Sequence, residues 1–215
     1  RIEFPIVKVG KKELKNVKLP VEIYKIVLPW QEAESRGEKA GLNRIAVLPL
    51  VNISANPDDE YFADGMTEEL ISTLSRMSGL RVIARTSVMK YKGEKKSIAE
   101  IGRELSVSTL LEGSVRKAAN RLRITVQLID TNTEEHIWAE NYDRDLQDVF
   151  ALQSEIAQRI AETLKVELLK EERNRIEKRK TQDVGAFKLY LKGRYFWNER
   201  TEEGLRKGIK YFEKA

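Results

Sequence analysis

The 215-residue chain contains no cysteine and a single histidine. Without thiols it cannot form disulfides, thiolate zinc sites or cysteine nucleophiles. The histidine, His136, lies in a predicted strand near Trp138. The sequence favours a surface histidine there over a member of a Ser-His-Asp triad, and no second imidazole exists to complete a zinc site. We therefore predict no metal site and no cofactor.

Long apolar runs are also missing. The longest covers residues 45–51, far short of the ~18 apolar residues that a helix needs to cross a bilayer. The first twelve residues lack both the apolar stretch and the small-residue cleavage site of a secretory signal. The sequence begins with Arg1 and ends at Ala215 within a helical pattern, so we interpret it as a fragment without membrane insertion.

The net charge of +5 is unevenly distributed. Residues 1–43 carry +3, residues 44–169 carry −4, and residues 170–215 carry +6. A protein that binds the phosphate backbone carries its excess positive charge on the folded surface that does the binding. Because the most strongly patterned region is mildly acidic, we expect protein partners rather than nucleic acid.

The patterns predict an α/β fold, a two-layer mixed sheet with packed helices, followed by a long helix and a helical hairpin. The predicted segments are a two-stranded hairpin (1–30), a linker (31–43), the α/β module (44–169), a charged helical spacer (170–182) and a helix pair (183–215). In the first, the expected strands cover 4–10 and 21–30. In the module, strands and helices follow the order β-α-β-α-β-β-β, which is typical of helices packed on one mixed sheet.

The clearest local signals lie between residues 97 and 145. Ser97 and Glu100 form an S-x-x-E capping box for a helix over 97–105. Alternating apolar residues predict strands over 108–118, 121–130 and 135–145, the first two joined by a tight Ala-Asn turn. Further strands are expected over 44–52 and 80–85.

The stretch DEYFADGMTEELISTLSRM, residues 59–77, concentrates acidic side chains at the start of a helix. A catalytic carboxylate pair is one interpretation, but it needs a converging base or metal ligand, and none is evident. Helix initiation is the favoured interpretation. Asp64 or Thr67 would cap the first amide groups, and Gly65 would allow a tight entry. Glu68 and Glu69, in the first turn, would favour the positive end of the helix dipole.

A second interpretation of the module is ligand binding. The amide groups at the start of the helix that follows Ser97 could hold a small anion or nucleotide. Five arginines at predicted sheet positions could form one positive stripe beside it: Arg81, Arg85, Arg116, Arg121 and Arg123. Arginines on an exposed sheet face also serve solubility alone, and no aromatic residues alternate with them as a base-stacking surface requires.

One long helix is expected from residue 146 to about residue 180. Its first half, over 146–169, keeps apolar residues at helical spacing, and its second half is charged with both signs. In the helix pair that follows, Gly208, Phe212 and Ala215 match the A-x3-F-x2-A half of a tetratricopeptide repeat (TPR). We predict that its exposed aromatic residues contact proteins: Tyr195, Phe196, Trp197 and Tyr211.

Several stretches resemble a known family, the TolB-amino-terminal-like module of bacterial and archaeal signalling proteins. They are RIAVLPLVNIS, EYFADGMTEELIS, LRVIARTSVMKYKG and the run from IGREL to IAQRI, within residues 44–166. The stretch VGKKELKNVKLPVEIYKIV resembles the final hairpin of class III adenylate/guanylate cyclase domains. The resemblance implies a non-catalytic module between a cyclase domain and TPR repeats, in the cytoplasm. The catalytic residues of such a cyclase would lie before Arg1.

The sequence therefore predicts a protein–protein interaction and signal-relay segment that is not an enzyme. Its partners would be proteins, including a second copy of the chain. The alternative is the ligand-sensing module centred on Ser97 and the arginines.

Overall fold

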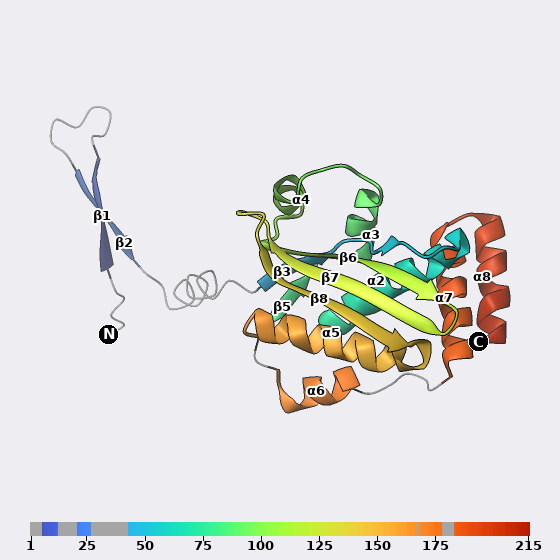
Figure 1. Ribbon diagram of the computed structural model, residues 1–215. Coiled ribbons are helices and arrows are strands. Elements are labelled where there is room, and N and C mark those ends of the chain that lie inside the picture. Colours follow the sequence, from blue (N-terminus) through green and yellow to red (C-terminus); the bar gives the residue numbers. More distant parts are fainter. Residues whose placement is uncertain (1–5, 13–20, 27–42, 167, 178–182) are drawn as a thin grey trace. The chain divides into compact units, whose positions relative to one another are not determined.

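The computed structural model describes residues 6–12, 21–26, 43–166, 168–177 and 183–215 (Figure 1). The chain divides into two units, Arg1–Leu42 and Asn43–Ala215. In the first unit, β1 (Ile6–Lys12) and β2 (Val21–Ile26) pair antiparallel, with an irregularity between Lys8 and Gly10. The two strands predicted for this region are both present with shifted ends, whereas the predicted linker lies almost entirely outside the described residues.

The second unit contains a six-stranded mixed sheet. Its order is β5-β3-β6-β7-β8, with β4 also paired to β6. Strand β3 runs parallel to both β5 and β6, whereas β6–β7 and β7–β8 are antiparallel. The bounds are β3 Asn43–Val47, β4 Val51–Asn52, β5 Leu80–Val82, β6 Thr109–Ala118, β7 Arg121–Asp130 and β8 His136–Asp145. The α/β class and the mixed sheet are confirmed.

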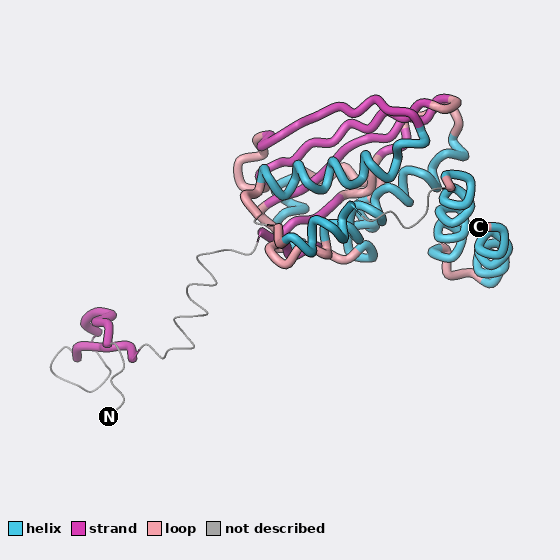
Figure 2. Tube along the Cα trace, turned by 90° about the horizontal axis from the view of Figure 1, so that it is seen from below, coloured by secondary structure: helices cyan, strands magenta, loops and turns pink. Residues whose placement is uncertain are grey.

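Helices α2 (Glu60–Leu74) and α5 (Val149–Thr163) cover one face of this sheet, as the two views show (Figure 1, Figure 2). Alternation along β7 explains the layering, because every second side chain faces the helices. Leu122, Ile124 and Val126 are fully buried, whereas Arg121 and Arg123 are exposed on the opposite face. The two-layer arrangement is therefore confirmed.

Helix α4 (Ile98–Leu105) begins with the predicted capping box. The Ser97 side chain accepts a hydrogen bond from the Glu100 amide, and the Glu100 carboxylate accepts one from the Ser97 amide. Shorter elements connect the rest: η1 Pro57–Asp59, α3 Arg85–Val88, η2 Met89–Tyr91 and η3 Leu146–Asp148. The predicted strand over 80–85 is therefore too long, since Arg85 begins a helix.

The single long helix predicted over 146–180 is wrong. Helix α5 ends at Thr163, Lys165 adopts a left-handed conformation with φ of 53°, and α6 (Lys170–Glu177) follows as a separate helix. The break places Val166 against Gly79, where a Cβ added to the glycine would lie 2.6 Å from Val166 Cγ1.

The predicted charged spacer, residues 170–182, is not entirely exposed to solvent. Within α6, Glu172 and Ile176 are buried. The Glu172 carboxylate accepts hydrogen bonds from the amides of Ser78, at 2.7 Å, and of Leu169, at 2.9 Å. One charged residue thus satisfies a backbone donor at the start of its own helix and another, Ser78, from a distant segment. Residues 178–182 of the predicted spacer lie outside the described residues.

The start of α2 also differs from the expectation. The helix begins at Glu60, so Asp64, Gly65 and Thr67 lie inside it and cap nothing at its N-terminus. Residues 57–59 form a preceding 3-10 turn, which Asn56 caps by accepting from the Asp58 amide at 3.0 Å. Because of this turn, helical structure begins at Pro57, before the residues that are expected to cap the helix.

Candidate protein-interaction site

Two antiparallel helices, α7 (Val184–Asn198) and α8 (Glu202–Lys214), form the C-terminal hairpin of the described chain. Small residues at their interface allow a close approach. A Cβ added to Gly193 would lie 2.5 Å from the Phe212 ring, and one added to Gly208 would lie 3.0 Å from the Gly193 carbonyl oxygen. The helical hairpin is present, and its assignment to a TPR stays a prediction.

The hairpin packs on the α/β module through α7. Leu191 fills the space over Gly65 of α2, where an added Cβ would lie 2.7 Å from Leu191 Cδ2. The rings of Phe187 and Phe150 meet edge to face with centroids 4.6 Å apart. Since Phe187 and Leu191 are both buried, the hairpin shares a core with the module.

A charged cluster reinforces this contact. Glu68 of α2 forms ion pairs with Arg85 of α3, at 3.4 Å to Nε, and with Arg194 of α7. Asn198 donates from Nδ2 to the same carboxylate at 3.5 Å. The side chains of Glu68 and Arg85 are about four-fifths buried, at 19% and 20% exposure. The cluster therefore links three helices through one partly desolvated carboxylate.

A groove of about 290 Å³ opens beside this contact, between the start of α2 and the hairpin. We call it the aromatic groove, because four of its lining residues carry aromatic rings. Its lining residues are Pro57, Asp58, Glu60, Tyr61, Lys192, Tyr195, Phe196 and Tyr211.

Ring and charge contacts define the geometry of the aromatic groove. Phe196 and Tyr211 stack with centroids 5.5 Å apart and an interplanar angle of 4°. The Lys192 ammonium lies 5.0 Å from the Tyr61 centroid and 5.8 Å from the Tyr211 centroid. Burial raises the pKa of Tyr61 to about 12, and the negative charge of Asp59 adds to the shift. The groove thus combines flat aromatic faces with one ammonium group held against two of the rings.

Three of the four predicted contact residues line the aromatic groove, namely Tyr195, Phe196 and Tyr211. Trp197 does not, and its ring lies 6.4 Å from the Phe212 ring and beneath Arg200. The expectation that all four would be exposed is wrong, because all are half-buried. Their rings pack against one another across the two helices, which the one-dimensional pattern does not reveal.

Three acidic residues at the start of the 59–77 stretch form ion pairs with lysines from other elements. Asp59 lies 2.5 Å from the Lys117 ammonium, and both Glu60 and Asp64 lie 2.6 Å from the Lys92 ammonium. Burial raises the pKa of Asp64, and the hydrogen bond from Lys92 opposes that shift. These contacts give the carboxylates structural roles. Among the described residues no group of three or more His, Asp or Glu side chains is placed to hold a metal ion.

The predicted anion position at Ser97 is already taken. The Glu100 carboxylate accepts from the Ser97 amide at 2.9 Å and from its hydroxyl at 3.1 Å. An external anion would compete with this internal one. Nearby, a cavity of about 430 Å³ lies between α4 and the open face of the sheet, lined by Tyr91, Ile98, Glu112, Gln127 and others.

The five arginines do not form one stripe. Arg121 and Arg123 form ion pairs with Asp143 at 2.5 and 2.8 Å. Arg85 belongs to the Glu68 cluster. Arg81, on β5, and Arg116, on β6, are separated by β3. The ligand-binding role of these residues and of Ser97 stays a prediction, while His136 is the exposed first residue of β8.

Comparison with known proteins places the module in a family. The second domain of HilA/YgeH-like transcriptional regulators matches residues 41–162. The chain belongs to this family. The family match is to a domain of transcriptional regulators, whereas the sequence motifs resemble the TolB-amino-terminal-like module.

A longer relative is similar over nearly all of the chain. "Putative adenylate cyclase 3" of Rhizobium meliloti (strain 1021) is 42% identical over 205 residues, which is 90% of this chain and 34% of the relative. The chain therefore spans about a third of that protein's length. No helix among the described residues combines the length and apolar character that a bilayer crossing requires.

Solved structures are similar at low identity. Lipoprotein GNA1162 from Neisseria meningitidis is 17% identical, with a TM-score of 0.43 over 57% of this chain and 99% of its own. TolB from Acinetobacter baumannii is 10% identical, with a TM-score of 0.42 over 75% of this chain and 31% of its own. Scores this low assign no function.

Proposed function

We propose that this chain is a non-catalytic protein–protein interaction and signal-relay segment of a multidomain cyclase-like regulator. Two observations support the context. The family is that of a regulator domain, and the relative named as a putative adenylate cyclase matches 90% of the chain. In that context the segment works in the cytoplasm and carries no catalytic residues of its own.

The proposed architecture follows the described elements. The antiparallel ribbon β1–β2 is the end of a cyclase-like domain, and residues 44–169 are the TolB-like module. Helices α7 and α8 are the first TPR-like pair, supported by the close approach of Gly193 and Phe212. A two-stranded ribbon is only marginally stable by itself, which supports an origin in a larger sheet.

The aromatic groove is the observation that carries the interaction role. Rings that are half-buried and already ordered lose little conformational freedom when a partner covers them, so they make efficient contact residues. The groove also joins elements of both the α/β module and the hairpin. A partner that fills it therefore contacts both parts at once.

The test compares two truncations on α8. Tyr211→Ala removes a ring from the aromatic groove, whereas Ile209→Ala removes an apolar side chain that is 48% exposed on the same helix and absent from the groove lining. Each tagged chain is used for quantitative affinity purification, with thermal melting to verify the fold. We expect Tyr211→Ala to lose specific partners that both the wild type and Ile209→Ala retain.

If the three chains recover the same partners, the groove is not the interaction site. A separate assay addresses catalysis. The chain is incubated with ATP or GTP and a divalent cation, and cyclic nucleotide is measured. We expect none, and turnover by the purified chain would contradict the non-catalytic assignment.

A further inference from the structure

Strand β8 lies at the margin of the sheet, and among the described residues it pairs with β7 alone (Figure 1). It is ten residues long and contains no proline, whereas the strand at the opposite margin, β5, has three residues. The outer edge of such a strand presents unpaired backbone N–H and C=O groups that can pair with another strand. Charged side chains on a long edge strand usually prevent pairing with another strand. The charges on β8 therefore determine which strand can pair with it.

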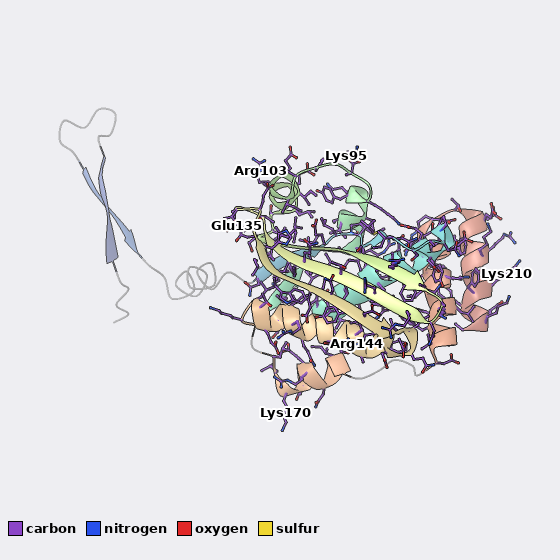
Figure 3. All side chains as sticks on the ribbon, viewed as in Figure 1. Lys95, Arg103, Glu135, Arg144, Lys170 and Lys210 are labelled. Carbon is purple, nitrogen blue, oxygen red and sulfur yellow. The ribbon has the colours of Figure 1, made fainter. Side chains whose placement is uncertain are left out.

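Two opposite charges on β8 are placed symmetrically. Glu140 and Arg144 each lie two residues from Tyr142, so all three side chains point to the same face of the strand. This is the face toward α5, because Glu140 lies 3.7 Å from Arg159 and Arg144 lies 3.4 Å from Glu155. Arg144 lies where the strand runs alongside α5 (Figure 3).

We infer that β8 pairs antiparallel with β8 of a second copy of this chain, about a two-fold axis through Tyr142. In this register Glu140 of each copy lies directly opposite Arg144 of the other. Because the interface is self-complementary, the favourable pair occurs twice. The two six-stranded sheets would join into one continuous sheet.

Neighbouring registers are less favourable. An axis at Asp143 or at Glu140 sets that carboxylate opposite its own copy, and like charges directly opposite are destabilising. An axis at Asn141 sets Glu140 opposite Tyr142 and forms no pair of opposite charges. With the axis at Tyr142, Asp143 faces Asn141 and Asp145 faces Ala139 on the open face, so no like charges meet. The charge pattern therefore selects one register.

The experiment measures the molar mass of residues 1–215 by light scattering and sedimentation over a concentration series. The variants are Glu140→Arg, Arg144→Glu and the double swap. We expect the wild type to dimerise and each single variant to weaken the dimer by about tenfold or more, since two favourable pairs become two repulsive ones. The double swap restores the pairs and the dimer.

Mixing separates pairing between chains from effects within one chain. A chain with Glu140→Arg and a chain with Arg144→Glu match each other at both positions, so an equimolar mixture should form the dimer that neither forms alone. Loss of the internal ion pairs with Arg159 and Glu155 would not be repaired by mixing. The matched control is Asp148→Lys, a charge reversal outside the paired strand, which should leave the dimer unchanged.

A monomeric wild type at all concentrations overturns the inference. So does a dimer that both single variants leave unchanged, or a mixture that stays monomeric. The inference deepens the proposed function, since it names a second copy as one partner. A failed dimer would leave the aromatic groove untouched, because the Tyr211→Ala comparison does not depend on β8.

Discussion

Leu191 of α7 lies directly over Gly65 of α2, so close that a Cβ on the glycine would come within 2.7 Å of the leucine Cδ2 atom. The two residues belong to different parts of the predicted architecture, the α/β module and the terminal hairpin. Their contact means that the hairpin packs at a defined position on the module.

Replacing Gly65 with valine should destabilise the chain by about 2 kcal/mol, because a β-branched side chain overpacks the contact with Leu191. Leu191→Ala alone should cost about 2–5 kcal/mol through the cavity it leaves. Urea denaturation of the two single variants and the double variant gives the coupling. We expect the double variant to lose clearly less than the sum, and simple additivity would show that the residues do not meet.

Glu68→Gln should cost about 2 kcal/mol, since it leaves the partly buried guanidinium groups of Arg85 and Arg194 without their counter-ion. Glu203→Gln is the matched control, because that carboxylate pairs with Lys207 on an exposed helix face at 78% exposure. Thermal and urea unfolding compare the two. Equal small effects would mean that the cluster does not hold α7 in place.

Asp64→Asn should change how stability depends on pH. Burial raises the folded-state pKa of Asp64 above its usual value of 3.8. The folded state therefore holds this proton more tightly, and stability falls as the pH rises from about 4 through the folded pKa. The asparagine side chain does not ionise, so the stability of the variant relative to the wild type should increase with pH. Denaturation curves between pH 4 and pH 7 measure this, and the reverse trend would show that the Lys92 ion pair outweighs burial.

Ser97→Ala should cost about 1 kcal/mol through loss of the capping box of α4. Phosphate should not raise the melting temperature of the wild type, because the carboxylates of Glu100 and Glu134 already accept from the amides of Ser97 and Ala99 at that helix start. Saturable stabilisation by phosphate, lost in Ser97→Ala, would instead support the ligand-sensing alternative. A Ser87→Ala variant, at an exposed position on α3, controls for removal of a hydroxyl group.

Much of the sheet and its helices could be predicted because their determinants are local. The β6–β7 hairpin has the predicted bounds at its Ala119–Asn120 turn, since alternation and a short turn fix both strands. The α4 capping box is likewise encoded within four residues. Signals of this kind need no knowledge of what packs against them.

What could not be predicted depends on partners far away in the sequence. Arg194 and Glu68 are 126 residues apart, and nothing near either one indicates the pair. The same holds for Val166 against Gly79, which accompanies the end of α5. The aromatic groove depends on both local and distant determinants. Helical spacing indicates the rings of α7 and α8, but it does not indicate that Tyr61 from α2 joins them.

The left-handed turn at Lys165 also bears on how force would pass from the hairpin to the sheet. An unbroken helix of roughly 35 residues would be a lever about 50 Å long, carrying the hairpin away from the sheet. In the structure α5 ends at this turn, and the hairpin packs on α2 through Leu191 and Arg194. A force applied to α7 and α8 therefore reaches the sheet layer through the packed contact with α2.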